Sequence, residues 1–138
     1  MSHMRTRCFR LRRGDDLRQS LERYVREQHI RAAVVLSAVG CVSRAVLRDA
    51  SGVTVRTLEE HLEIVSLMGT LSEARTHLHI ALSREDLSTV GGHLKDGCIV
   101  NTTAEVVLLE LSGVAFGAGY DPETGYDELV ISHEEEPK

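Results

Sequence analysis

The chain has 138 residues, of which 42% are hydrophobic and 27% charged, and its formal net charge is −5. This length and composition are typical of a single globular domain that can bury a core without disulfides. The acidic balance argues against a general nucleic-acid binder, and the absence of a long apolar run argues against a membrane-spanning protein.

The charge is divided unevenly along the chain. Residues 1–56 hold 12 arginines and 5 acidic residues, a balance of +7, whereas residues 57–138 hold 4 basic and 16 acidic residues, a balance of −12. This asymmetry can indicate a basic face for an acidic partner, or two halves that complement each other within one fold or across a subunit interface. We favour the second interpretation.

The ends and the cysteines suggest a cytoplasmic domain. Residues 1–3 resemble an expression-tag remnant, so we expect the domain to span 4–132, followed by an acidic tail at 133–138. Cys8, Cys41 and Cys98 are odd in number, far apart and in no metal-ligand spacing, which is typical of reduced thiols in the cytoplasm. We expect Cys98 to be a buried core residue rather than a nucleophile.

The first part of the chain predicts two strands around one helix. Residues 5–11 alternate as in a strand, and Asp15 is the expected N-cap of an amphipathic helix that runs to about His29. The helix is indicated by apolar residues at helical spacing, namely Leu17, Leu21, Tyr24 and Val25. The small apolar run 32–39 predicts a buried strand that Gly40 ends.

The middle of the chain predicts further strands. Residues 42–48 form one, a turn at Ser51-Gly52 leads into residues 53–55, and a long strand spans 61–71. Simple alternation divides the long strand into two faces: Leu62, Ile64, Ser66 and Met68 on one, and Glu63, Val65 and Leu67 on the other. Glu63 would then lie among hydrophobic residues and would need a partner if buried.

After a turn at 72–75, the remaining chain predicts strands around 77–79, 89–94 and 103–111, a short apolar segment at 98–100, and a last strand at 126–132. The glycine-rich segment 113–125 is expected to be a mobile loop. Many strands with one clear helix indicate an α+β domain built on a mainly antiparallel sheet.

The histidines His77, His79 and His93 form the most chemically informative pattern. Residues two apart on a strand project from the same face, so His77 and His79 point together, and Gly91-Gly92 would let a neighbouring backbone bring His93 close. Three neutral imidazoles with one further position for water are a common zinc-binding set, although imidazole also suits copper, iron and nickel. The alternative is three polar side chains on a half-exposed sheet face.

Two carboxylates are candidates to support such a site. Glu105 shares a predicted strand face with Val107 and Leu109, as Glu63 does with its own apolar neighbours. Either carboxylate could orient a ligating histidine through a hydrogen bond, or could form a salt bridge with an arginine of the first half. Cys98 is the thiol that could replace water as a fourth ligand.

Several motifs in order resemble the PPC family, the plants and prokaryotes conserved domain. The motifs are Arg-Gly-Asp-Asp-Leu (13–17), Ile-Arg-Ala-Ala-Val-Val-Leu-Ser-Ala-Val-Gly (30–40), Leu-Glu-Ile-Val-Ser-Leu-Met-Gly-Thr-Leu (62–71), His-Leu-His-Ile-Ala-Leu (77–82), Val-Gly-Gly-His-Leu (90–94) and Gly-Cys-Ile-Val-Asn-Thr-Thr-Ala-Glu-Val (97–106). The resemblance is clear from Cys8 to Leu111. It implies a stand-alone prokaryotic member with an α+β fold, assembled as a homotrimer.

The resemblance also bears on partners and ligands. Some prokaryotic members bind metal, which the resemblance implies for His77, His79 and His93. The family label is DNA-binding protein, but this sequence lacks the AT-hook that precedes the domain in plants. The plant segment Gly-Arg-Phe-Glu-Ile-Leu, which contacts transcription factors, corresponds to residues 60–65, where Glu63 and Ile64 match but Glu60 and His61 differ.

Two functions from different classes follow. The first is a homotrimeric binding or regulatory module with a histidine metal site, connected to transcription through a protein partner. The second is a metal-dependent enzyme or small-ligand-binding protein that uses the same three histidines. Direct DNA binding is disfavoured because aromatic residues are few and the net charge is acidic.

Overall fold

The computed structural model describes residues 4–134, so the expected tag remnant at 1–3 and residues 135–138 of the expected tail lie outside the described residues. The elements in chain order are β1 (Arg5–Arg12), α1 (Leu17–Glu27), β2 (Ala33–Arg48), β3 (Val55–Leu58), β4 (Leu62–Leu71), β5 (Thr76–Ser83), β6 (Thr89–Leu94), β7 (Ile99–Glu110), β8 (Val114–Asp121) and β9 (Tyr126–His133).

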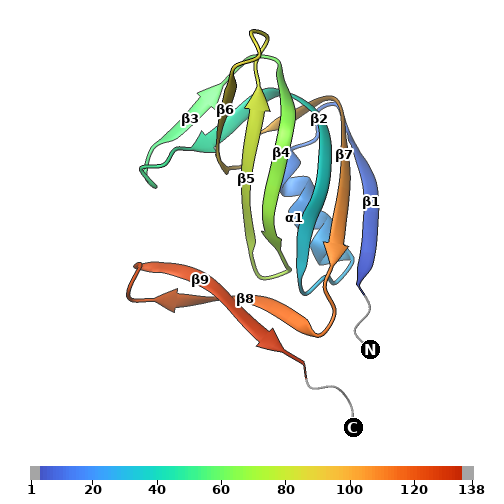
Figure 1. The fold of residues 1–138 in the computed structure, drawn as a ribbon, viewed down its shortest axis with the longest axis vertical. Helices are drawn as coiled ribbons and strands as arrows, with labels where there is room; N and C mark the ends of the chain where they lie inside the picture. The colour runs from blue at the N-terminus through green and yellow to red at the C-terminus, as the bar shows by residue number, and fades with distance from the viewer. Residues whose placement is uncertain (1–3, 135–138) are drawn as a thin grey trace.

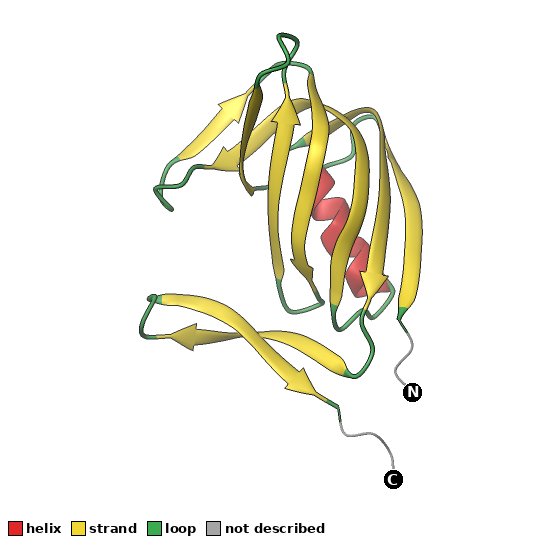
Figure 2. Cartoon of the chain, in the orientation of Figure 1, coloured by secondary structure: helices red, strands yellow, loops and turns green. Residues whose placement is uncertain are grey.

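Seven of the strands form one antiparallel sheet. Its order is β1-β7-β2-β4-β5-β6, with β3 paired to β2 outside this path. Figure 1 shows α1 against one face of the sheet and the β8–β9 hairpin beyond the strand ends, and Figure 2 shows the same arrangement by type of element. The expected α+β fold with a mainly antiparallel sheet is confirmed.

Helix α1 closes the core over that face of the sheet. Leu17, Leu21 and Val25 are fully or almost fully buried, as the helical spacing predicted. The N-cap is Asp16, whose side chain accepts a hydrogen bond from the Gln19 N–H, so the prediction of Asp15 was wrong by one residue. Asp15 instead accepts from the Arg12 N–H in the preceding turn. No helix within residues 4–134 has the length and apolarity needed to cross a bilayer.

Strand β2 is continuous from Ala33 to Arg48, and the prediction that Gly40 ends it was wrong. Register shifts in the β2–β7 pairing, one of them between Gly40 and Cys41, bend the strand without ending it. Gly40 permits this because a Cβ there would lie 2.1 Å from the Thr103 carbonyl oxygen. The predicted segments 98–100 and 103–111 likewise merge into β7, with Thr102 at a positive φ of 61°.

A bulge also changes the two faces of β4. The β4–β5 register shifts between Ile64 and Ser66, so the alternation of side chains reverses at this point. Leu67 is therefore buried and Met68 is exposed, the opposite of the faces expected from simple alternation. Glu63 is exposed, so it requires no buried partner.

The segment from Gly113 to Gly125 is not a loop, as predicted, but contains strand β8, which pairs with β9 along its whole length. Gly117 and Gly119 make β8 glycine-rich, and Val130 of β9 lies against both. A strand with so few side chains gives little periodic signal in sequence. The expected last strand at 126–132 is confirmed as β9.

The opposite charges of the two halves meet within the fold. Arg7 is hydrogen-bonded through both Nε and Nη2 to Glu110 Oε2, at 3.0 and 2.8 Å. Three further pairs join an arginine of residues 1–56 to a later carboxylate: Arg18–Asp96, Arg31–Glu134 and Arg44–Glu59. The halves therefore complement each other at least in part within one fold, which is one of the two arrangements that our interpretation allowed.

Strand β6 lies between β5 and the end of β2, and two glycines make room for it. A Cβ on Gly91 would lie 2.4 Å from the Ile80 carbonyl oxygen of β5, and one on Gly92 would lie 2.7 Å from the Arg48 carbonyl oxygen of β2. These distances confirm the expected close approach of neighbouring backbones at Gly91-Gly92. With β2 pairing both β4 and β6, the strands β2, β4, β5 and β6 close a circuit.

We predict that Gly91→Ala destabilises the protein by about 1–3 kcal/mol, because the added methyl group collides with the β5 backbone. The matched control is Gly117→Ala, a strand glycine whose added Cβ would meet nothing closer than 3.8 Å. The control should be neutral or stabilising by up to about 1 kcal/mol, since alanine loses less entropy on folding. Urea unfolding measures both, and equal effects of the two substitutions would contradict the packing argument.

Candidate metal centre

The pairing of three strands brings the histidines together. His79 of β5 lies directly opposite His93 of β6, and His77 lies two residues before His79 on the same face. In the adjoining pairing, Arg48 at the end of β2 lies opposite His93. The register therefore places Arg48, His93 and His79 in one row across the sheet.

The three imidazoles are within range of a single ion. The ring centroids are 5.1 Å apart for His77–His79, 5.2 Å for His77–His93 and 5.5 Å for His79–His93. One nitrogen from each ring lies within 4.8 Å of the others. Tetrahedral zinc with Zn–N bonds of about 2.0–2.1 Å needs nitrogens about 3.3–3.4 Å apart, so small side-chain rotations would complete the geometry.

Burial and nearby positive charges keep His77 and His93 in their metal-binding form. Burial lowers the pKa of His93 to about 4, and the charge of Arg48 contributes to the same shift. Burial also lowers the pKa of His77, followed by the charge of Arg75. Both rings are therefore neutral at pH 7, and a neutral imidazole is the form that donates a lone pair to a metal.

Two arginines contact the rings at Nδ1. Arg75 Nη1 lies 3.3 Å from His77 Nδ1, and Arg48 Nη2 lies 3.5 Å from His93 Nδ1. A guanidinium has only donors, so Nδ1 is the acceptor in each contact and Nε2 carries the hydrogen of the neutral ring. Arg48 Nε is buried and has no hydrogen-bond partner within residues 4–134. A buried donor without a partner lowers the free energy of unfolding by about 1–3 kcal/mol.

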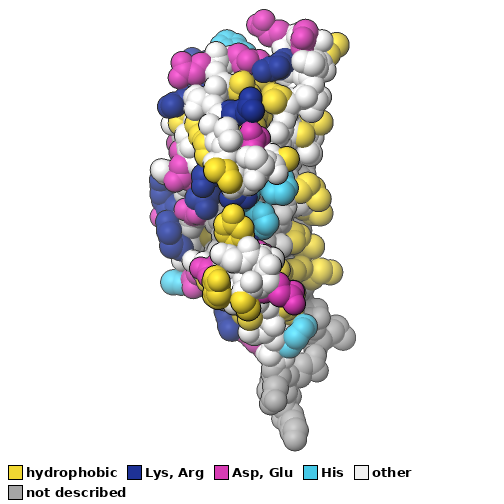
Figure 3. Space-filling model, turned by 90° about the vertical axis from the view of Figure 1, so that its left-hand side faces the viewer, with side chains coloured by type: hydrophobic (Ala, Val, Ile, Leu, Met, Phe, Trp, Pro, Cys, Tyr) yellow, Lys and Arg dark blue, Asp and Glu magenta, His cyan; other side chains and the backbone are white. Residues whose placement is uncertain are grey.

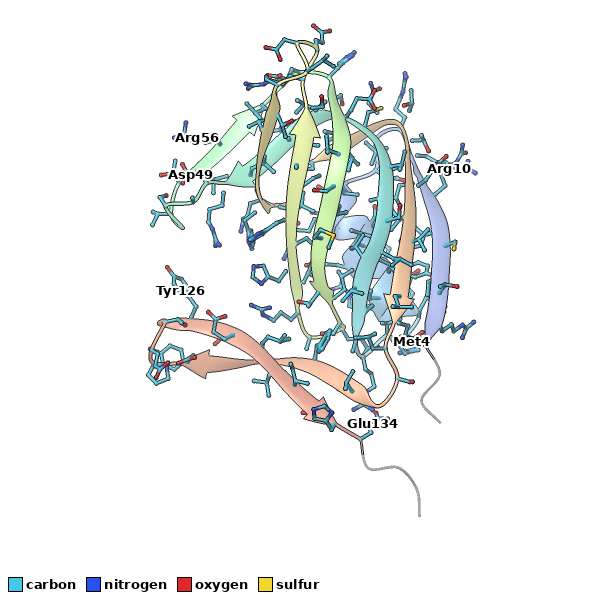
Figure 4. All side chains as sticks on the ribbon, viewed as in Figure 1. Met4, Arg10, Asp49, Arg56, Tyr126 and Glu134 are labelled. Carbon is cyan, nitrogen blue, oxygen red and sulfur yellow. The ribbon has the colours of Figure 1, made fainter. Side chains whose placement is uncertain are left out.

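Residues of the β8–β9 hairpin line one side of the site. His77 borders two cavities, one of about 350 Å³ that includes His79 and one of about 270 Å³ that includes His93. Arg75 and Glu128 border both cavities. Figure 3 shows histidine side chains next to Lys and Arg side chains midway along this side of the molecule. Figure 4 shows Tyr126, which lines the smaller cavity, at the start of β9 and projecting toward the sheet.

The other sequence candidates lie elsewhere. Glu105 is exposed on β7, three strands from β5 in the sheet order, at a spacing of about 14 Å. Glu63 is exposed at the start of β4, opposite Ser83 at the far end of β5. Cys98 is fully buried, and burial raises its pKa to about 11, as expected for a core residue rather than a nucleophile. The structure thus brings the histidines together without these three side chains.

Sequence reasoning missed the charged residues that border the histidines: Arg48, Arg75 and Glu128. Arg75 had a usable signal, because it precedes His77 by the same two-residue step that separates His77 from His79. Arg48 and Glu128 had no such signal in the sequence. Arg48 reaches the site through the β2–β6 strand pairing, and Glu128 through its approach to Arg75, so both depend on segments that are distant in sequence.

We predict that the chelator-treated protein loses stability as the pH falls from about 6.5 toward 4. The unfolded chain has an ordinary histidine pKa of about 6.5, whereas His93 in the fold has a pKa of about 4, so the unfolded state binds more protons in this range. Urea unfolding at several pH values should show that the free energy of unfolding depends less steeply on pH in His93→Asn than in the wild type. The control His61→Asn, at an exposed position, should keep the wild-type slope; equal slopes in all three proteins would contradict the prediction.

Two solved structures are similar to this chain over nearly its whole length. A hypothetical protein from Salmonella enterica has 34% sequence identity and a TM-score of 0.92, with 96% of each chain covered. A metal-containing protein from Archaeoglobus fulgidus has 32% identity and a TM-score of 0.77, with 91% of this chain and 93% of that one covered.

A curated relative is the bifunctional protein GlmU of Synechococcus sp. (strain JA-3-3Ab), 45% identical over 128 residues. The match takes in 93% of this chain but only 21% of the relative, so the chain spans about a fifth of that protein's length. The model of the Plants and Prokaryotes Conserved domain matches residues 1–112. The chain therefore belongs to the Plants and Prokaryotes Conserved domain family.

Proposed function

We propose that this domain binds one divalent metal ion, with Zn²⁺ the best fit, through His77, His79 and His93. The observation that carries the proposal is the convergence of three ring nitrogens within 4.8 Å, produced by the β5–β6 register. The lowered pKa values of His77 and His93 support it, because they keep these ligands neutral. The metal-containing relative from Archaeoglobus fulgidus is a second support.

In this proposal the fourth ligand is water, because Cys98 is enclosed in the core. Bound zinc lowers the pKa of such a water toward about 7 and polarises an oxygen bound beside it. Glu128 is the carboxylate close enough to His77 to act on its pKa. Glu128 is therefore our candidate for proton transfer in the alternative function, a metal-dependent enzyme.

We also propose that the domain assembles as a homotrimer and acts as a binding or regulatory module. The sheet face opposite α1 exposes Leu36, Val39, Val65 and Met68, each more than half accessible. Large apolar side chains grouped on one face are a common mark of a protein interface. A cyclic trimer would cover the face of each subunit with a different face of the next.

Direct DNA binding is not part of the proposal. Five arginines of the first half pair with carboxylates: Arg7, Arg18, Arg31, Arg44 and Arg56. Neutralised in this way, they offer less charge to phosphate groups than the sequence count suggests. A role in transcription would then require a protein partner.

We predict that the wild-type protein binds one zinc ion per chain, and that His77→Ala, His79→Ala and His93→Ala each weaken zinc affinity by more than about 100-fold. Loss of an outer-shell partner alone weakens metal binding by about 10–100-fold, so loss of a ligand should exceed that range. Affinity should also fall as the pH drops toward about 4, where His93 becomes protonated and loses its lone pair for the metal. Elemental analysis and calorimetric titration measure these effects.

The control is His61→Ala, which removes an exposed histidine that does not belong to the cluster. It should retain the wild-type zinc content. Equal zinc content in all the variants would mean that the three histidines do not hold the ion.

We predict a solution mass of three times the 15.3 kDa chain by light scattering. Val39→Glu and Val65→Glu should lower this mass, because each places a charge in the apolar face. The matched control is Val53→Glu, at a 78% exposed position in the turn between β2 and β3. A wild-type protein that is monomeric at micromolar concentrations would contradict the trimer.

A further inference from the structure

Arg48 is the charged group of the site that lacks a carboxylate partner. No carboxylate within residues 4–134 lies in ion-pair range of its guanidinium, and its buried Nε has no hydrogen-bond partner in the same range. The one hydrogen bond that its side chain makes within these residues joins Nη2 to His93 Nδ1 at 3.5 Å. The Arg48 side chain is half-buried, and a guanidinium carries five donors, so its remaining Nη hydrogens are available to a ligand.

Arg75 makes more contacts than Arg48, but both of its contacts are long. Its Nη2 lies 3.9 Å from Glu128 Oε2, at the outer limit of an ion pair, and its Nη1 contacts His77 Nδ1 at 3.3 Å. Its side chain is only 16% exposed. Arg48 and Arg75 both border the cavity of about 270 Å³, together with His77 and His93.

Metal binding would release both arginines from the imidazoles. An ion bound at Nε2 requires the hydrogen to move to Nδ1, where it would face an arginine donor. An ion bound at Nδ1 would displace the arginine directly. In either case the Arg48–His93 and Arg75–His77 contacts are lost, and both guanidinium groups gain donors that need an acceptor.

The charge balance indicates what that acceptor is. Arg48 and Arg75 are balanced in the cavity lining by Asp127 and Glu128. A divalent ion held by three neutral imidazoles adds two positive charges without a protein carboxylate to balance them. An anion of one or two charges would restore neutrality in a partly enclosed cavity, where charges are less screened than in water.

We propose that the cavity bounded by Arg48, Arg75, His77, His93 and Tyr126 binds a small oxyanion, a carboxylate or phosphate group, beside the metal. Arg48 supplies the main contact, since a guanidinium can donate two parallel hydrogen bonds to either group. This inference rests on the proposed metal site. Asp127 and Glu128 at the same cavity repel extended polyanions, so the ligand is a small molecule rather than a nucleic-acid backbone.

The test is calorimetric titration of zinc-loaded protein, freed of excess zinc, with malonate and with inorganic phosphate. The neutral analogue malonamide should not bind. Binding of malonate assigns the site to carboxylates, and binding of phosphate assigns it to phosphate groups. Arg48→Gln should weaken binding at least tenfold, and Arg75→Gln should weaken it to a smaller extent.

The control is Arg10→Gln, which removes the same charge from strand β1 at the opposite edge of the sheet (Figure 4). It should bind the anion as the wild type does. If Arg48→Gln does not fold, Arg48→Lys keeps the charge but loses the two-pronged donor geometry, and it should still bind the anion more weakly.

The outcomes separate this inference from the metal proposal. If zinc loads but neither anion binds, or if Arg48→Gln and Arg48→Lys bind as tightly as the wild type, the anion site is wrong and the metal site stands. If zinc does not load, the metal proposal is wrong, and the anion site that rests on it is overturned with it.

Discussion

The candidate site depends on the position of β6 between β5 and the end of β2. Gly91 and Gly92 allow this position, because a side chain at either would collide with a neighbouring backbone. The resulting register sets His93 opposite both His79 and Arg48. A shift by one residue would send His93 to the other face of the sheet, so the register of a single short strand determines whether the cluster exists.

The chemistry of the site follows from the placement of charge around that cluster. Burial, with a smaller contribution from the neighbouring arginines, keeps His77 and His93 neutral, which favours metal binding. The arginines also make a bound cation electrostatically costly. Glu128 offsets part of this cost, and the bound anion would offset the rest. The same arginines therefore have two roles: they help burial to keep His77 and His93 neutral before the metal binds, and they bind the anion afterwards. Such coupling would make metal and anion affinities mutually dependent.

The sequence predicted the local features of the fold and of the site. The helix, most strands, the shared face of His77 and His79 and the close approach at Gly91-Gly92 all depend on residues near one another in the chain. The errors arose where a bulge interrupts the period, as in β2 and β4, or where glycines weaken it, as in β8. Arg48 and Glu128 reach the site through long-range pairing and packing, which a single sequence does not specify.

The most direct measurement of the central claim is the anomalous diffraction of a zinc-loaded crystal, recorded on both sides of the zinc absorption edge. The account predicts one strong peak per chain, about 2.0–2.1 Å from a nitrogen of each of His77, His79 and His93. A peak bound elsewhere, or none between these three rings in a crystal grown with zinc, would contradict it.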